Sequence, residues 1–185
     1  MSGSIDNKVF NQLFELIKQN ALIFGKFTLA SGEESNYYFD IKKAIFDPET
    51  IDLIATVILD CLKDEDFDFL GGMEVGAIPL IASVVMKSSK ERKPIRGFFV
   101  RKKLKEHGTR KRVEGWLEED SKVILLEDVT TSGSSVMEAI STVEEIGCTV
   151  KKVIAIVDRE KGAGERLKSH GIDFYTIFKK SDFGI

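Results

Sequence analysis

The chain has 185 residues, of which 43% are hydrophobic and 31% are charged, a mixture typical of a soluble globular protein. Its formal net charge is −3, so the overall charge does not indicate a nucleic-acid partner. The sequence begins without a signal-peptide pattern and contains no apolar run long enough to cross a membrane. Its two cysteines are isolated, which predicts a cytoplasmic protein in a reducing compartment. From the charge and the lack of a long apolar run, we expect neither a nucleic acid nor a membrane as partner.

The N-terminal part is predicted to contain two helices with a short aromatic region between them. Apolar residues in the segment 9–17 recur at helical spacing. Residues 27–41 are rich in aromatic side chains, which is typical of short strands and turns. Asp47 followed by Pro48 predicts the start of the second helix, with the aspartate as N-cap.

From residue 67 onward the pattern alternates between strands and helices. Such an alternation predicts a parallel sheet with right-handed crossovers and helices on both faces. We therefore interpret residues 1–185 as a single α/β domain. Its core spans 66–180, and residues 1–65 with part of the C-terminus form a small hood. The predicted strands are 67–71, 95–100, 122–127, 152–157 and 174–178, and the predicted helices are 77–87, 135–146 and 164–170.

A basic segment follows the predicted strand 95–100. Residues 101–112 include seven arginines and lysines in twelve positions, a local reversal of sign in an acidic chain. A solvated loop or an RNA-contacting patch would also explain this composition. The carboxyl ends of neighbouring parallel strands meet at one edge of a sheet, where ligands bind. Basic side chains at that edge suit a leaving group with several negative charges, such as pyrophosphate.

The most informative segment runs from Val123 to Ser135. Its apolar start suits a strand that is covered on both faces. Glu127 and Asp128 then come at the carboxyl end of that strand. Hydroxyl-bearing residues and a glycine follow at the N-terminus of the next helix, where backbone N–H groups and the helix dipole favour an anion. The pattern Ser135-x-x-Glu138 predicts a capping box for this helix.

A ribose 5-phosphate fits this segment, because the carboxylates accept hydrogen bonds from a diol and the turn holds the phosphate. An ordinary turn whose polar residues only cap the helix is the simpler alternative, although capping needs one such residue. The metal-holding strand of a P-loop ATPase is another, but no G-x-x-x-x-G-K-[ST] occurs in the chain. The segment resembles the phosphoribosyl-pyrophosphate (PRPP) signature of the type I phosphoribosyltransferases.

Four other segments narrow the resemblance to the orotate phosphoribosyltransferases. Residues 101–108 resemble the flexible catalytic loop of that family. Segments 24–32, 35–40 and 157–160 are similar to its substrate-contacting segments and come in the expected order. The resemblance implies a type I phosphoribosyltransferase fold, with a central parallel sheet flanked by helices and a small N-terminal hood. It also implies Mg²⁺-dependent transfer of ribose 5-phosphate from PRPP to orotate, giving orotidine 5′-monophosphate and pyrophosphate in pyrimidine biosynthesis.

The resemblance also implies roles for individual residues. It implies no metal ligand in the protein, with Mg²⁺ held mainly through PRPP and water, and a homodimer that shares the basic loop across its interface. The catalytic residues would be Lys102, Lys105 and His107. PRPP would be bound by these three with Arg101, Glu127, Asp128, Val129, Thr130, Thr131, Ser132, Gly133, Ser134 and Ser135. Orotate would be bound by Lys26, Tyr38, Phe39, Thr131 and Arg159.

One segment departs from the family pattern. Val75 and Gly76 stand where many members carry a Tyr-Lys pair in the loop that contacts pyrophosphate. Backbone N–H groups of a glycine turn still bind anions there, but a lysine side chain is missing. Two other functions stay open: transfer to another base within the same fold, and a regulator that binds PRPP as a signal and nucleic acid as its target.

Overall fold

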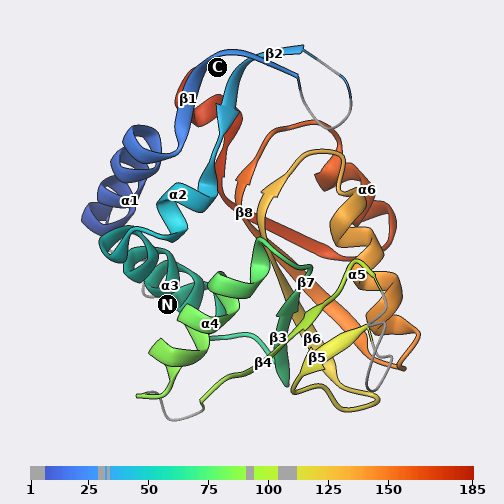
Figure 1. Ribbon diagram of the computed structural model, residues 1–185. Helices are drawn as coiled ribbons and strands as arrows, with labels where there is room; N and C mark the ends of the chain where they lie inside the picture. The colour runs from blue at the N-terminus through green and yellow to red at the C-terminus, as the bar shows by residue number, and fades with distance from the viewer. Residues whose placement is uncertain (1–6, 29–31, 33, 91–93, 104–111) are drawn as a thin grey trace.

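The computed structural model describes residues 7–28, 32, 34–90, 94–103 and 112–185. These residues form one six-stranded sheet with helices on both faces, and a separate two-stranded hairpin (Figure 1). None of the helices in these ranges is long and apolar enough to cross a membrane. The elements are α1 (Asn7–Asn20), β1 (Leu22–Thr28), β2 (Glu34–Phe39), α2 (Ile41–Ile45), α3 (Pro48–Leu62), β3 (Phe69–Gly72), α4 (Ala77–Ser88), β4 (Arg96–Val100), β5 (Val113–Gly115), β6 (Lys122–Thr130), α5 (Ser134–Glu144), β7 (Thr149–Asp158), α6 (Ala163–Ser169), β8 (Asp173–Lys179) and the 3₁₀ helix η1 (Lys180–Phe183).

The sheet confirms the predicted parallel core. Its strand order is β5-β4-β3-β6-β7-β8, and every pair is parallel except β4 with β5. All five predicted strands form, and β6 continues to Thr130, three residues beyond its predicted end at 127. The antiparallel edge strand β5 was not predicted, because three residues with a glycine carry no strand pattern. The carboxyl ends of β6 and β7 therefore lie side by side in the centre of the sheet.

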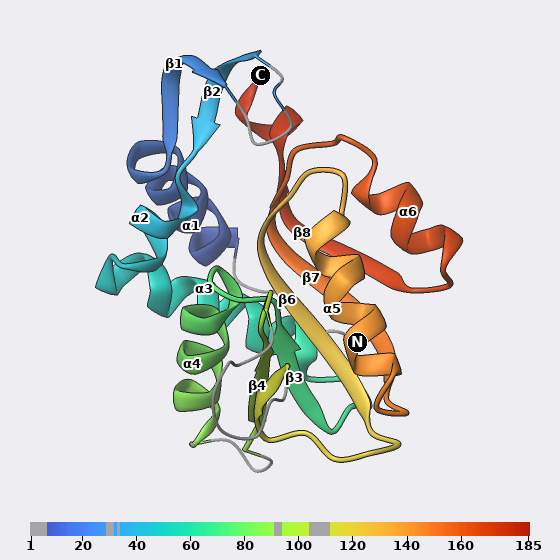
Figure 2. The ribbon, with the colours of Figure 1, turned by 45° about the vertical axis from the view of Figure 1, so that its right-hand side comes forward.

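The side chains of β6 explain why both faces of the sheet are covered. Ile124 and Leu126 are fully buried in a cluster that includes residues of α1, α3 and α4, whereas Val123 and Leu125 are fully buried in a second cluster that includes residues of α5 and α6. Figure 2 shows α4 and α5 on opposite sides of the sheet. Successive side chains of a strand point to opposite faces, so an unbroken apolar run requires helices on both sides. This confirms the prediction of a two-sided sheet.

The N-terminal elements pack together with the C-terminal segment. As predicted, α3 begins at Pro48, and the Asp47 carboxylate caps it by accepting the Thr50 N–H at 2.8 Å. The ring of Phe183 in η1 stacks on Phe14 of α1 at a centroid distance of 4.8 Å, and meets Phe39 of β2 at 5.2 Å. The hairpin β1–β2 and the end of the chain consequently lie next to each other, beyond the carboxyl ends of β7 and β8 (Figures 1 and 2).

Candidate active site

A cavity of about 680 Å³ lies at the carboxyl ends of β6 and β7, beneath the hairpin β1–β2. Residues from four separate parts of the chain line it, so the fold gathers groups that are distant in sequence. Twelve predicted site residues are among them. The lining residues are Thr28, Tyr38, Phe39, Lys42, Glu127, Asp128, Val129, Thr130, Thr131, Ser132, Gly133, Ser134, Ser135, Val136 and Arg159.

Five other predicted residues are not part of this lining. Lys26 lies on β1, where the hairpin register shifts between Phe24 and Phe27, and its side chain is exposed. Arg101 and Lys102 follow β4 at the same edge of the sheet as the cavity. Lys105 and His107 lie outside the described residues.

The turn between β6 and α5 offers an anion-binding geometry. Gly133 has a φ of +77°, a left-handed conformation that glycine adopts without steric cost, and it occupies the N-cap position of α5. The hydroxyl groups of Ser132 and Ser134 lie 2.9 Å apart. Arg166 of α6 donates to the Ser132 carbonyl at 3.4 Å and to the Ser134 hydroxyl at 3.2 Å. A phosphate at this helix N-terminus would meet backbone N–H groups, hydroxyls and a nearby guanidinium.

The predicted capping box of α5 is wrong. The helix begins at Ser134, one residue earlier than predicted, and no side chain caps it. The Glu138 carboxylate instead accepts a hydrogen bond from Arg112 at 2.5 Å. A left-handed glycine turn brings the chain into the helix, so the first-turn N–H groups have no capping side chain competing for them.

The two carboxyl groups sit deep in the cavity wall, with Glu127 8% and Asp128 9% exposed. Asp128 is held from two sides. Its Oδ1 accepts the Val129 N–H at 2.9 Å, and its Oδ2 accepts the Lys42 ammonium at 3.2 Å. Gly76, the N-cap of α4, lies against the same carboxylate, since a Cβ added there would be 2.5 Å from Oδ2. The absence of a side chain at Gly76 therefore permits the position of Asp128.

Burial dominates the electrostatics of Glu127. It raises the pKa of the Glu127 carboxyl well above its usual range, and the charge and hydrogen bond of Asp128 raise it further. The positive charges of Lys102 and Lys42 act in the opposite direction on this pKa. The Asp128 carboxylate in turn raises the pKa of Lys42, so this ammonium is charged at neutral pH.

Arg159 is a buried cation in the lining of the cavity. Its side chain is 7% exposed, and the guanidinium lies over the Tyr37 ring at 5.0 Å, with a long contact of 3.5 Å to the Ser35 hydroxyl. Its backbone N–H donates to the Thr130 carbonyl at 2.9 Å. The Thr130 hydroxyl donates to buried Asp158 at 2.9 Å. These contacts hold the guanidinium against the hairpin and the backbone of Arg159 beside Thr130, the last residue of β6.

The two predicted aromatic residues of the hairpin, Tyr38 and Phe39, both line the cavity but differ in burial. Phe39 is 5% exposed and packs on Phe183, whereas Tyr38 is 41% exposed. Successive residues of a strand point to opposite faces, so Tyr37 and Phe39 share one face and Tyr38 lies on the other. Tyr37, which we did not predict as a site residue, contacts the guanidinium of Arg159.

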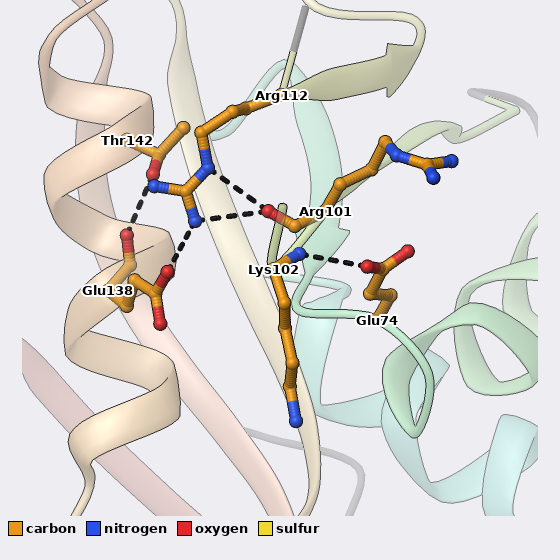
Figure 3. Close-up of polar contacts among 6 residues, drawn as sticks. All are labelled: Glu74, Arg101, Lys102, Arg112, Glu138 and Thr142. Carbon is orange, nitrogen blue, oxygen red and sulfur yellow. Dashed lines mark hydrogen bonds and ion pairs between the residues drawn. The ribbon is translucent and has the colours of Figure 1, made fainter. Parts of the chain in front are cut away.

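The two ends of the basic segment are tied together and to their neighbours (Figure 3). The Arg112 guanidinium donates twice to the Arg101 carbonyl, at 3.1 and 3.0 Å, and pairs with Glu138 of α5. The Lys102 N–H donates to the Glu74 carboxylate at 2.9 Å. The basic segment thus begins beside Glu74, in the loop before α4, and ends beside α5.

Three buried side-chain atoms in the described part of the chain have no hydrogen-bond partner. They are Arg101 Nε, Glu127 Oε2 and Arg159 Nε. Buried polar groups are nearly always paired, because leaving one unpaired costs about 1–3 kcal/mol. All three belong to predicted site residues, which indicates that this region is built to receive a polar ligand.

A scan against models of known protein families finds no match for this chain. Curated relatives are nevertheless similar over almost its whole length. An orotate phosphoribosyltransferase of Bradyrhizobium diazoefficiens is 41% identical over 176 residues, which cover 93% of this chain and 94% of the relative. Another, of Methanosphaera stadtmanae, is 41% identical over 174 residues, 94% of this chain and 95% of the relative. The chain belongs to the orotate phosphoribosyltransferase family.

Solved structures of the family agree with this assignment. The Mycobacterium tuberculosis orotate phosphoribosyltransferase in complex with Fe(III) dicitrate is similar with a TM-score of 0.84 at 30% identity, covering 96% of this chain and 99% of the other. The same enzyme in complex with PRPP gives a TM-score of 0.80 at 28% identity, with the same coverage. The predicted type I phosphoribosyltransferase fold is confirmed.

Sequence reasoning missed Thr28, Lys42 and Val136 of the lining in this orotate phosphoribosyltransferase family member, together with Tyr37 and Arg166, which contact lining residues. The alternation of side chains along a strand could have indicated Tyr37, because Arg159 needs a contact on one face of the hairpin. Lys42 and Arg166 carried no signal of their own, since a single surface cation on a short helix is ordinary. Their positions depend on how α2 and α6 pack against the sheet.

Proposed function

We propose that this chain catalyses transfer of ribose 5-phosphate from PRPP to N1 of orotate. The bond from C1′ to pyrophosphate breaks, the bond from C1′ to N1 forms, and the N1 proton passes to pyrophosphate or water, which gives orotidine 5′-monophosphate and pyrophosphate for pyrimidine nucleotide synthesis. One observation carries the proposal: a buried acid pair, an anion-binding turn and a buried arginine line a single cavity. These are anchors for the ribose diol, the 5′-phosphate and the orotate carboxylate.

The segment from Glu127 to Ser135 binds PRPP in this proposal. Asp128, held by Val129 and Lys42, presents its carboxylate to the ribose hydroxyls. The unpaired Glu127 Oε2 gains a donor from the same diol. The turn from Thr131 to Ser135 holds the 5′-phosphate at the N-terminus of α5, as expected for a phosphate at a helix start.

The orotate carboxylate pairs with Arg159 in this proposal. An arginine fork binds a carboxylate through two parallel N–H···O bonds, and stacking on Tyr37 fixes its plane. Tyr38 and Phe39 border the ring, and Thr131 borders both substrates. Lys26 lies on the hairpin and not in the lining, so its role as an orotate contact rests on the family resemblance.

Charge develops on pyrophosphate as the C1′ bond breaks. The basic segment stabilises this charge, with Arg101 and Lys102 at the start of that segment and Lys105 and His107 outside the described residues. We propose Mg²⁺ as cofactor, bound mainly through PRPP oxygens and water. Glu127 and Asp128 offer hard oxygen donors that suit it, and the described residues contain no cluster of three metal-ligating side chains. When bound, Mg²⁺ neutralises negative charge on the leaving group.

An assay of base specificity tests the proposed function. The protein is incubated with PRPP and Mg²⁺ together with orotate, uracil or hypoxanthine, and loss of each base is followed by absorbance. Orotate is expected to be consumed and uracil to be a poor substrate, since it leaves the guanidinium of Arg159 unpaired. Comparable turnover of uracil or hypoxanthine would assign the chain to another base, whereas PRPP binding without turnover would favour a regulator.

We also propose that the protein is a homodimer whose basic segment serves the partner's site. The outward face of α4 supports a second copy as occupant: Ile78, Ala82 and Met86 recur every four residues, and Met86 is 71% exposed. Val75, just before this helix, is 67% exposed. An isologous dimer is the commonest soluble assembly.

Subunit complementation tests the shared segment. Lys105→Ala and Asp128→Asn are each expected to be nearly inactive alone. After reversible dissociation and mixing, about one quarter of wild-type activity should return, because half of the dimers are mixed and each has one intact site of two. No recovery despite confirmed subunit exchange would show that the basic segment serves its own chain.

A cytoplasmic location completes the proposal. It is supported by Cys61 and Cys148, which are both free thiols in the described structure, as expected in a reducing compartment.

A further inference from the structure

Lys42 is one of two basic residues that line the cavity in the part of the chain that the structure describes, the other being Arg159. It lies on the short helix α2, directly after the hairpin. Its ammonium is 3.2 Å from Asp128 Oδ2, and its side chain is 54% exposed whereas that of Asp128 is 12% exposed. An ammonium has three donors, so the bond to Asp128 leaves Lys42 able to contact a second anion in the cavity.

Gly76 lies against the same carboxylate that Lys42 contacts. The carboxylate of Asp128 occupies the space that a side chain at Gly76 would need, with the added Cβ 2.5 Å from Oδ2. The loop before α4 therefore cannot present a lysine from this position without displacing Asp128. Lys42 approaches the same carboxylate from a different element. The charge missing from the loop is thus present in the cavity, on another part of the chain.

We propose that Lys42 is a PRPP-binding residue that contacts the pyrophosphate group and supplies the cation absent from the loop at Val75 and Gly76. The inference rests on the proposed function, because it takes PRPP as the ligand. Without ligand, Lys42 neutralises Asp128 and holds its carboxylate toward the cavity. With PRPP bound, the ammonium lies between Asp128 on the ribose and the phosphate oxygens attached to C1′. A compact, mobile ammonium suits this double contact better than a rigid guanidinium.

Binding measurements separate this role from simple support of Asp128. PRPP and pyrophosphate carry the group that Lys42 is proposed to contact, whereas ribose 5-phosphate carries only the diol and the 5′-phosphate. Isothermal titration calorimetry of the full chain is expected to show that Lys42→Met weakens PRPP and pyrophosphate about 10- to 100-fold, the value of a charge-assisted contact. Ribose 5-phosphate should bind within about threefold of wild type, a difference below 1 kcal/mol, because the Val129 N–H still holds Asp128 and the ion pair of the half-exposed Lys42 contributes little to that position.

Lys43→Met is the matched control. Lys43 is the next residue of α2, is exposed and does not line the cavity, and its loss changes net charge by the same amount. It should leave all three affinities within about twofold of wild type. Lys42→Arg, which keeps the charge, should recover part of the lost pyrophosphate affinity. Circular dichroism and thermal unfolding confirm that each variant is folded before its titration.

Two results would overturn the proposal. In one, Lys42→Met weakens ribose 5-phosphate as much as PRPP, which would mean that Lys42 only supports Asp128. In the other, Lys42→Met and Lys43→Met have equal effects, which would mean a general loss of positive field. The wild-type assay with orotate stands apart from both, since failure there would reject the proposed reaction while the affinities would still decide whether Lys42 contacts pyrophosphate.

Discussion

The two halves of the candidate site are built differently. The half that we propose binds PRPP is one continuous segment from Glu127 to Ser135, which leaves the centre of the sheet and enters α5. The half that we propose binds the base is assembled from the hairpin β1–β2 and the residue that follows β7, with Arg159 resting on Tyr37. A continuous segment keeps its geometry through its own turn and strand, whereas an assembled one depends on packing between distant elements. The two halves should therefore fail differently when altered.

The largest expected effect separates the halves by substrate. Arg159→Ala should lower kcat/KM for orotate by about 10²–10³-fold, because truncating one partner of a buried charge pair costs 2–5 kcal/mol. The KM for PRPP should change little. Asp128→Asn should do the reverse, raising the KM for PRPP far more than that for orotate. Steady-state kinetics with each substrate varied in turn measures both.

Arg159→Lys is the control for charge alone, since it keeps the cation but loses the planar fork and the stacking on Tyr37. Recovery of only a small part of the orotate activity would show that geometry carries the effect. If Arg159→Ala and Asp128→Asn lower both affinities equally, the division of the site into two halves is wrong.

The next effect concerns the connection between the halves. Thr130 of the PRPP segment donates to Asp158, the buried residue before Arg159. Thr130→Val preserves shape and removes this donor, so it should lower the free energy of unfolding by about 1–3 kcal/mol in urea titrations. Thr56→Val, which removes a hydroxyl bond to a backbone carbonyl on α3, is the control and should cost less than about 0.5 kcal/mol. Equal losses of unfolding free energy in Thr130→Val and Thr56→Val would mean that the buried Thr130–Asp158 hydrogen bond stabilises the fold no more than an exposed one.

A pH prediction follows from the raised pKa of Glu127. Its cause is chiefly burial, so the folded protein holds this proton at a pH where the unfolded chain has lost it. Stability is therefore lost as pH rises above the ordinary carboxyl value of 4.5 and toward the folded pKa. Glu127→Gln lacks this loss and should be more stable than wild type at neutral pH, with the gap closing below about pH 4.5. Urea titrations across this range test it, and a gap that widens toward low pH would contradict the burial argument.

The same division explains what could be predicted from the sequence. The strands, the helices on both faces and the segment 127–135 follow from local patterns, because apolar periodicity and turn chemistry lie in consecutive residues. The cap of α5 was mispredicted, since Ser135 and Glu138 fit a local rule while Arg112 recruits Glu138 from across the chain. A long-range ion pair leaves no trace in a local pattern.

The contacts between elements were the part that no local pattern contained. Lys42 meets Asp128 across 86 positions of sequence, and Arg159 meets Ser35 across 124. The family resemblance supplied Arg159 but not Lys42 or Tyr37. Placing those residues required the packing of α2 and the hairpin over the sheet, which single-residue chemistry does not determine.

The smallest expected effect concerns the ion pair between the basic segment and α5. The Arg112–Glu138 pair links the end of the basic segment to α5, the helix that begins at the phosphate turn (Figure 3). The partners are 27% and 46% exposed, so a double-mutant cycle should give a coupling below about 1 kcal/mol in stability. The Lys87–Asp52 pair, 30% and 65% exposed and remote from the cavity lining, is the matched control with a similarly small coupling. The pairs should differ in kinetics: Glu138→Ala should raise the KM for PRPP about two- to fivefold by loosening the anchor of the basic segment, whereas Asp52→Ala should not change it. Equal kinetic effects of Glu138→Ala and Asp52→Ala would show that the ion pair to α5 does not position the basic segment for PRPP.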